Sequence, residues 1–256
     1  MLTTYAQFER LHSGIYHDSW HAQTVSKLAS GMAMQAGFSR KDSRFLAQVA
    51  LLHNADERRC VKSGERQPLL PPQVHNTLDW LLSNRDSICR HFCWTKHNFH
   101  MACALIARTC YPFDAEPRLL GETFNGKSPV EVAAHFINLL APEQREDALR
   151  LGLILRFADQ VANYTGNWKR VTLSLAGLVR ELQSTGVKVS TAELGTESFL
   201  HQVGNDLNQD RALALRFGIS RDGLFGREAL LGLMPPAVLR RFEANLEALG
   251  RVAVAA

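Results

Sequence analysis

The sequence has few features of a strand-rich, secreted or membrane-spanning protein. Only residues 186–191, GVKVST, alternate apolar and polar side chains in the pattern typical of a strand. Its five cysteines form no Cys-x-x-Cys pair, and the first residues contain no basic segment followed by an apolar run. No apolar run approaches the roughly 20 residues that span a bilayer. We therefore expect a cytoplasmic protein with free thiols and no membrane partner.

The charge balance also excludes one class of partner. The sequence has 29 basic and 25 acidic residues, a formal net charge of +4, and no block of like charges. This excess is too small to indicate nucleic-acid binding, although it suits a small anionic substrate. The chain has 256 residues, of which 46% are hydrophobic, enough for one large domain or two small ones. The composition leaves a homo-oligomer open.

Helical periodicity dominates what is present. Apolar residues recur at three- and four-residue steps, and several segments begin with residues that cap helices. Ser39 is a candidate cap with Asp42 in the first turn, and Ser128 precedes Pro129 and Glu131 in a capping-box pattern. The predicted helices cover residues 18–36, 39–53, the segment VHNTLDWLL, 98–109, a helix from 128, 142–164, and further helices within 195–249, the last opened by Pro235 and Pro236.

This pattern predicts an all-α protein. We expect a helical core over residues 1–165 and a C-terminal helical extension, residues 166–256, packed on that core. The boundary is soft, because no linker-like composition marks it. The amphipathic segments of the extension are expected to cap the core.

Three histidines and one aspartate are the main candidate functional residues. His17 and His21 are four residues apart, so they would face one cavity if the predicted helix begins by Asp18. His53 closes an apolar helix, and Asp159 lies inside another, where a carboxylate needs a cation or a donor to offset its desolvation. A cation bound between these segments would use imidazole and carboxylate ligands.

A simpler interpretation exists for each residue taken alone. A single histidine on an apolar face is usually a core or surface residue without a special role. A buried aspartate on a helix is more often paired with an arginine, and Arg156 lies three residues before Asp159. The order and context of the four residues together favour a site.

This order resembles the HD superfamily of metal-dependent phosphohydrolases. That family has a histidine, then a His-Asp doublet closing an apolar helix, then a distant aspartate; here these are His21, His53 with Asn54, and Asp159. The segments YHDSWH (16–21), HNADE (53–57) and ADQVAN (158–163) are most similar to its cyclic-nucleotide phosphodiesterase branch. The resemblance covers roughly residues 12–165 and implies an HD-like helical bundle.

The resemblance implies a role for each matching residue. His21, His53, Asn54 and Asp159 would hold a divalent metal (Mn, Mg, Zn or Fe), which would activate water against a small phosphorylated substrate, with a nucleotide as one candidate. His17 would donate a proton to the leaving oxygen, with Asn54 and Asp56 in further catalytic roles. Weaker candidates complete the set: His75 and His97 for a second metal, Lys96, Arg58 and Arg156 for phosphate, and Asn163 for substrate.

Two positions depart from the family pattern. Asn54 stands where the family has the aspartate of the doublet, and Glu57 stands where phosphodiesterases have another histidine. Three explanations of Asn54 compete: a substitution introduced to abolish turnover, a natural enzyme homologue that has lost activity, or replacement of the carboxylate by Asp56 or Glu57. We favour the first. Two alternative functions also remain, a di-iron HD-domain oxygenase and a non-catalytic nucleotide-binding or interaction module.

Overall fold

The structure, a computed structural model, describes residues 12, 17–56, 74–109, 127–183, 196–220 and 223–255. Within these residues the chain is all-α, with eleven helices and no β-strand, as the periodicity predicts. The predicted extended segment 186–191 lies outside the described residues. The helices are α2 (Ser19–Gln35), α3 (Arg40–Leu52), α4 (Val74–Ser83), α5 (Arg85–Phe92), α6 (Lys96–Ala107), α7 (Pro129–Asn138), α8 (Pro142–Ala162), α9 (Trp168–Gln183), α10 (Thr196–Arg216), α11 (Arg227–Gly232) and α12 (Pro236–Ala255).

Helix starts follow the capping residues. The Ser39 hydroxyl accepts a hydrogen bond from the Asp42 backbone N–H at 3.1 Å, as the sequence predicts. At α7 the Ser128 hydroxyl accepts from the Glu131 N–H at 3.3 Å, while the Glu131 carboxylate accepts from the Ser128 N–H at 2.7 Å. These reciprocal bonds satisfy N–H groups that have no partner within the helix, so both predicted starts are confirmed.

Helix α6 begins two residues earlier than its periodicity suggests. Thr95 caps it, and the Asn98 side chain returns a bond to the Thr95 backbone. An asparagine in place of the usual Glu or Gln gives the same reciprocal pattern. The capping chemistry therefore sets the start at Lys96, where the apolar pattern alone placed it near 98.

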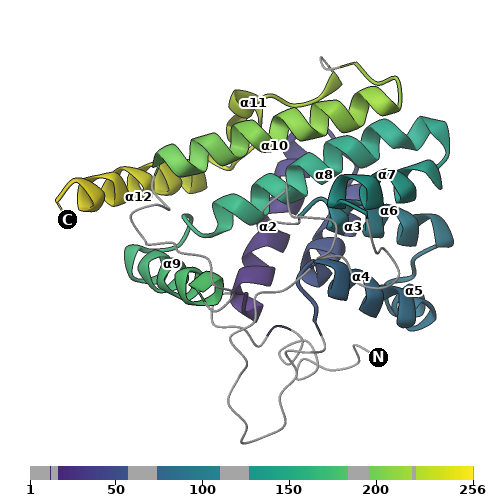
Figure 1. Cartoon of the computed structure of the whole chain (residues 1–256), viewed down its shortest axis with the longest axis horizontal. Coiled ribbons are helices and arrows are strands. Elements are labelled where there is room, and N and C mark those ends of the chain that lie inside the picture. The colour runs from purple at the N-terminus through teal and green to yellow at the C-terminus, as the bar shows by residue number, and fades with distance from the viewer. Residues whose placement is uncertain are drawn as a thin grey trace, which may run out of the picture.

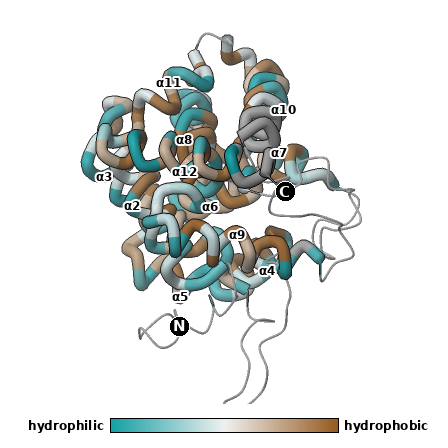
Figure 2. Tube along the Cα trace, turned by 90° about the vertical axis from the view of Figure 1, so that its left-hand side faces the viewer, coloured by the Kyte–Doolittle hydropathy of each residue, from teal (hydrophilic) through white to brown (hydrophobic). Residues whose placement is uncertain are grey.

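Helix α8 forms the centre of the core. It packs against α2, α6 and α10, while α2 and α3 pack against each other as neighbours in sequence. In Figure 1 the C-terminal helices α10 and α12 run along one side of the molecule, and α9 lies near the start of α2. Figure 2 shows hydrophobic and hydrophilic patches alternating along the helices, as expected for helices with one buried face.

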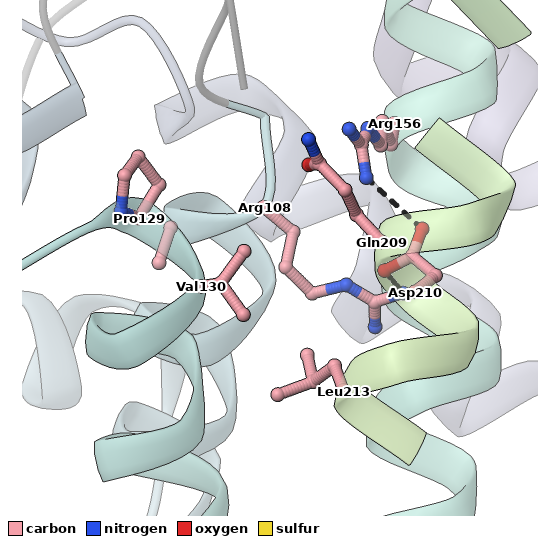
Figure 3. A pocket seen from close by; sticks show the side chains of 8 residues that line it. Arg108, Pro129, Val130, Arg156, Gln209, Asp210 and Leu213 are labelled. Carbon is pink, nitrogen blue, oxygen red and sulfur yellow. Dashed lines mark hydrogen bonds and ion pairs between the residues drawn. The ribbon is translucent and has the colours of Figure 1, made fainter. Parts of the chain in front are cut away.

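A buried ion network joins α10 to the core. Asp210 pairs with Arg108, the C-cap of α6, and with Arg156 of α8, whose Nη1 lies 3.0 Å from Asp210 Oδ2. Arg108 also donates from Nη1 to the carbonyl of Leu149 at 2.7 Å. Figure 3 shows these side chains around a small pocket beside the first residues of α7. All three charged side chains are at least 96% buried, so each depends on the others for solvation.

The described cysteines match the expectation of free thiols. Cys89, Cys93 and Cys103 form no disulfide, and Cys60 and Cys110 lie outside the described residues. Burial raises the pKa of the Cys103 thiol, which behaves as a small apolar group inside the core. Among the helices that the structure describes, none combines the length and apolarity required to cross a membrane.

The ion network predicts that Gly152 on α8 tolerates no side chain. A Cβ there would lie 2.1 Å from Arg108 Nη1, and this guanidinium cannot move without losing its bonds to Leu149 and Asp210. We expect Gly152→Ala to lower the free energy of unfolding by about 2 kcal/mol or more, because hydrogen bonds to charged groups contribute roughly 1.5–3 kcal/mol each. Urea unfolding followed by circular dichroism measures the change.

Gly31→Ala on α2 is the matched control. A Cβ at Gly31 meets nothing within 4 Å, so alanine should stabilise the helix by about 0.5–1 kcal/mol. Equal effects of the two substitutions would show that Arg108 is not held in place.

Candidate metal centre

The start of α2 orients His21, whereas His17 precedes the N-cap and lies outside the helix. Asp18 is the N-cap, and its Oδ1 accepts the backbone N–H of His21 at 2.8 Å. Because the cap fixes the first turn, His21 points from α2 into the core, where it is 1% exposed. The rings of His17 and His21 lie edge to face, with centroids 5.5 Å apart.

His53 is held by the end of its own helix. It is the C-cap of α3, and its Nδ1 lies 2.6 Å from the backbone carbonyl oxygen of Ala50. A carbonyl only accepts, so Nδ1 carries the proton and donates it. In the neutral ring Nε2 then has a lone pair, which is the form in which histidine binds metals.

Asp159 brings the two imidazoles together. Its Oδ1 lies 2.9 Å from His21 Nε2 and 3.2 Å from His53 Nε2, although the three residues come from α8, α2 and α3. The three candidate ligand atoms lie within 4.8 Å of one another. The arginine pairing considered for Asp159 does not occur, because Arg156 pairs with Asp210.

These separations match the spacing of ligands around one cation. Ligands at about 2.1 Å from a tetrahedral or octahedral ion lie roughly 3.0–3.4 Å from each other. The two distances from Asp159 Oδ1, 2.9 and 3.2 Å, fall close to that range. The donor set of two imidazoles and one carboxylate is also one that Zn²⁺ and Fe²⁺ use in proteins.

The electrostatics of His53 and Asp159 favour a positive charge between them. With the Nδ1 proton donated to Ala50, the Nε2 lone pair of His53 faces a carboxylate oxygen at 3.2 Å. Two lone pairs this close repel unless a proton or a cation lies between them. The case of a proton between them is a positively charged His53: burial raises the pKa of Asp159, but that charge and hydrogen bonds donated by His53 and His21 outweigh burial and hold the pKa below its usual value.

Asn54 contacts the same imidazole nitrogen. Its Nδ2 lies 2.7 Å from His53 Nε2, and the side chain is buried. The nitrogen and oxygen of an amide exchange places by rotation about the last side-chain bond, so Asn54 can present either atom towards this nitrogen. As a ligand, its oxygen would be neutral.

A second pair adjoins this cluster. His17 Nδ1 lies 2.6 Å from Oε2 of Glu181 on α9. The carboxylate accepts the Nδ1 proton, so in the neutral ring the lone pair of His17 is on Nε2. The Glu181 side chain is 1% exposed and that of His17 is 16% exposed, so the carboxylate is buried behind the ring.

The other candidate residues lie in several places. Asp56 is fully buried after α3 and does not join the three-residue cluster, and neither do His75 on α4 or His97 on α6. Lys96 is exposed at the first position of α6, and Asn163 is the C-cap of α8. Arg58 and Glu57 lie outside the described residues.

Arg156 has a different role from the one expected. The side chain is 4% exposed and its guanidinium pairs with Asp210 of α10, so it serves the packing of the C-terminal helices. Because that charge is already paired and shielded from solvent, we do not include Arg156 among the groups that would bind a phosphate.

Sequence reasoning did not find Glu181, Arg170 or the Ala50 carbonyl. Glu181 lies 164 residues from its partner His17, and Arg170 lies 152 residues from its partner Asp18. On a helix with an exposed face both resemble ordinary solvated charges. The available signal for His53 was its position at the end of an apolar helix, where the ring reaches back to a free carbonyl.

Comparisons with family models, curated proteins and solved structures found no match for this chain.

The cluster predicts metal binding that depends on Asp159. We expect Asp159→Asn, which removes the charge and keeps the size, to weaken Zn²⁺ binding more than about a hundredfold. Loss of a group that only supports a metal ligand lowers metal affinity roughly 10- to 100-fold, and Asp159 would itself be a ligand. Isothermal titration calorimetry measures the affinity, and circular dichroism with a chelator checks that the variant stays folded.

His91→Ala is the control, because His91 is exposed on α5 and its recorded contact is with the neighbouring Phe92 ring. Equal losses of Zn²⁺ affinity in the Asp159→Asn and His91→Ala variants would rule out a specific site at Asp159.

Proposed function

We propose that this chain is a metal-dependent phosphohydrolase or phosphodiesterase acting on a small phosphorylated substrate. The observation that carries the proposal is the convergence of His21, His53 and Asp159 from three helices, with His17 beside them. The order of these residues along the chain, which resembles the HD superfamily, selects this reaction from the many that such ligand sets support.

The proposed cation would be held by His21 Nε2, His53 Nε2 and the Asp159 carboxylate, with the Asn54 oxygen as a fourth group if the amide rotates. Two imidazoles favour Zn²⁺ or Fe²⁺ over Mg²⁺, which prefers oxygen ligands. When bound, such an ion would activate a water molecule and polarise a phosphoryl oxygen. The Ala50 carbonyl orients His53 for this task by fixing its tautomer.

His17 is the proposed proton donor to the leaving oxygen. Glu181 accepts the Nδ1 proton, holds the ring in one orientation and stabilises it when positively charged. Histidine suits proton transfer because it ionises near neutral pH. The ring lies next to His21, so a phosphate ester at the cluster would be within reach of His17.

Exposure indicates from which side a substrate would approach. The His53 side chain is fully buried and that of His21 is 2% exposed, whereas Asp159 is 21% and His17 16% exposed. Solvent therefore reaches the cluster past Asp159 and His17. A phosphate ester entering there would meet the ligand cluster and the proton donor together.

Asn54 bears directly on activity. A neutral amide leaves a divalent cation with one ligand charge, that of Asp159, where an aspartate at position 54 would give two. The amide also cannot accept a proton from an attacking water. We therefore expect slow turnover in the present chain, and this residue favours a second candidate function, a module that binds a nucleotide without hydrolysing it.

The described residues supply too few grouped ligands for the di-iron alternative. It requires about six ligands, and the cluster within the described ranges contains two histidines and one carboxylate, with Asn54 adjacent.

Asn54→Asp tests the role of the amide. We expect this variant to hydrolyse phosphate esters at least tenfold faster than the present chain with Mn²⁺ or Zn²⁺, because it restores a charged ligand and proton acceptor. Release of phosphate or alcohol from a panel of nucleotides and simple esters measures the rate. No turnover by either protein across the panel, with metal bound, would leave the binding module as the function.

Leaving groups test His17 as the donor. In the Asn54→Asp background, His17→Gln should slow hydrolysis of an alkyl ester by about 10²–10⁴-fold, the usual contribution of general acid catalysis. A para-nitrophenyl ester should be slowed far less, since para-nitrophenolate departs without a proton. Steady-state rates with both esters give the comparison. Equal slowing of the two would contradict the assignment and indicate that His17 acts through binding.

A further inference from the structure

Helix α9 contacts the start of α2 at two points. Arg170 near its beginning reaches Asp18, and Glu181 near its end reaches His17. These two α9 residues are eleven positions apart, about three helical turns, so they lie on one face of the helix. Val171, Ser174 and Leu175 between them are buried, which shows that the same side of α9 packs inward.

Arg170 makes two different contacts at this point. Its Nη2 lies 2.6 Å from Asp18 Oδ2, and its guanidinium carbon lies 4.2 Å from the centre of the Trp20 ring. Gly166 leaves room for the arrangement, since a Cβ there would lie 3.2 Å from Arg170 Cβ and 3.6 Å from the Trp20 ring. The guanidinium is therefore held by an ion pair with Asp18 at one edge and by the Trp20 ring against its face.

Asp18 uses each carboxylate oxygen for a separate partner. Oδ1 accepts the His21 backbone N–H, while Oδ2 accepts from Arg170. An asparagine at this position could cap the helix but could not form the ion pair with Arg170. The aspartate thus links α9 to the residue that places His21 in the cluster.

This ion pair is less open to water than one on a fully exposed surface. Exposed pairs contribute little to stability because water screens them. Here the Arg170 and Asp18 side chains are 31% and 27% exposed, so screening is weaker, and stacking on Trp20 removes much of the entropic cost of ordering the arginine.

We propose that Arg170 is a positioning residue of the metal centre, which holds His21 in place through the carboxylate of Asp18. This proposal rests on the function proposed above. Arg170 touches neither ligand cluster nor substrate in this arrangement; it acts on the orientation of the first turn of α2.

The experiment has two readouts on the full chain. The first is hydrogen exchange of the His21 backbone amide in chelator-treated protein, measured by NMR. Arg170→Gln should speed this exchange about five- to tenfold, because Asp18 loses the partner that holds its carboxylate. The second is the Zn²⁺ dissociation constant from calorimetry, which should rise about tenfold, as for other groups that support metal ligands.

Three further variants make the result specific. Lys169→Gln removes the same charge from an exposed neighbour on α9 and should change both readouts less than twofold. Arg170→Lys keeps the charge and should recover most of the Zn²⁺ affinity. The double variant Asp18→Asn, Arg170→Gln should bind Zn²⁺ no more weakly than the weaker-binding of the two single variants. Both substitutions break the same ion pair, so their effects should not add.

The outcomes separate this proposal from the proposed function. Unchanged amide exchange in Arg170→Gln overturns the positioning role, and so does faster exchange with unchanged Zn²⁺ affinity. Failure of the unmodified chain to bind Zn²⁺ overturns the proposed metal centre and with it the role of Arg170 there. The amide exchange then still decides whether Arg170 fixes the start of α2.

Discussion

The meeting of two buried imidazoles at one carboxylate is the interaction on which the site depends. Asp159 lies on the central helix, and the free energy cost of desolvating it is offset by His21 and His53. With the Nδ1 proton donated to Ala50, a second proton or a cation between His53 Nε2 and the carboxylate oxygen would remove the repulsion between their lone pairs. Either one would also offset the charge of this carboxylate.

The surrounding helices keep these three groups together. Helices α2 and α3 pack side by side and both reach α8, so their histidines approach Asp159 from neighbouring helices. The Asp18 cap aims His21 inward, and the end of α3 fixes His53. Nearer the start of α8, the Arg108–Asp210–Arg156 network attaches α10, so the central helix has buried charged groups with two separate sets of partners.

Much of the helical fold could be predicted from the sequence, because caps and periodicity are local signals. Ser39 and Ser128 mark helix starts through hydrogen bonds to residues three positions away. The grouping of His21, His53 and Asp159 could be anticipated from their order and apolar surroundings. The roles of Glu181 and Arg156 could not, because each depends on a partner on another helix that only packing brings near, and a charged residue on an amphipathic helix looks the same whether it is solvated or paired.

Anomalous X-ray scattering from crystals grown with Zn²⁺ tests the central claim most directly. The account predicts one strong peak about 2.0–2.2 Å from His21 Nε2, His53 Nε2 and the Asp159 carboxylate, with the His53 Nδ1 bond to Ala50 retained. Crystals at saturating Zn²⁺ that show no peak there, with both imidazoles still hydrogen-bonded to Asp159, would contradict it.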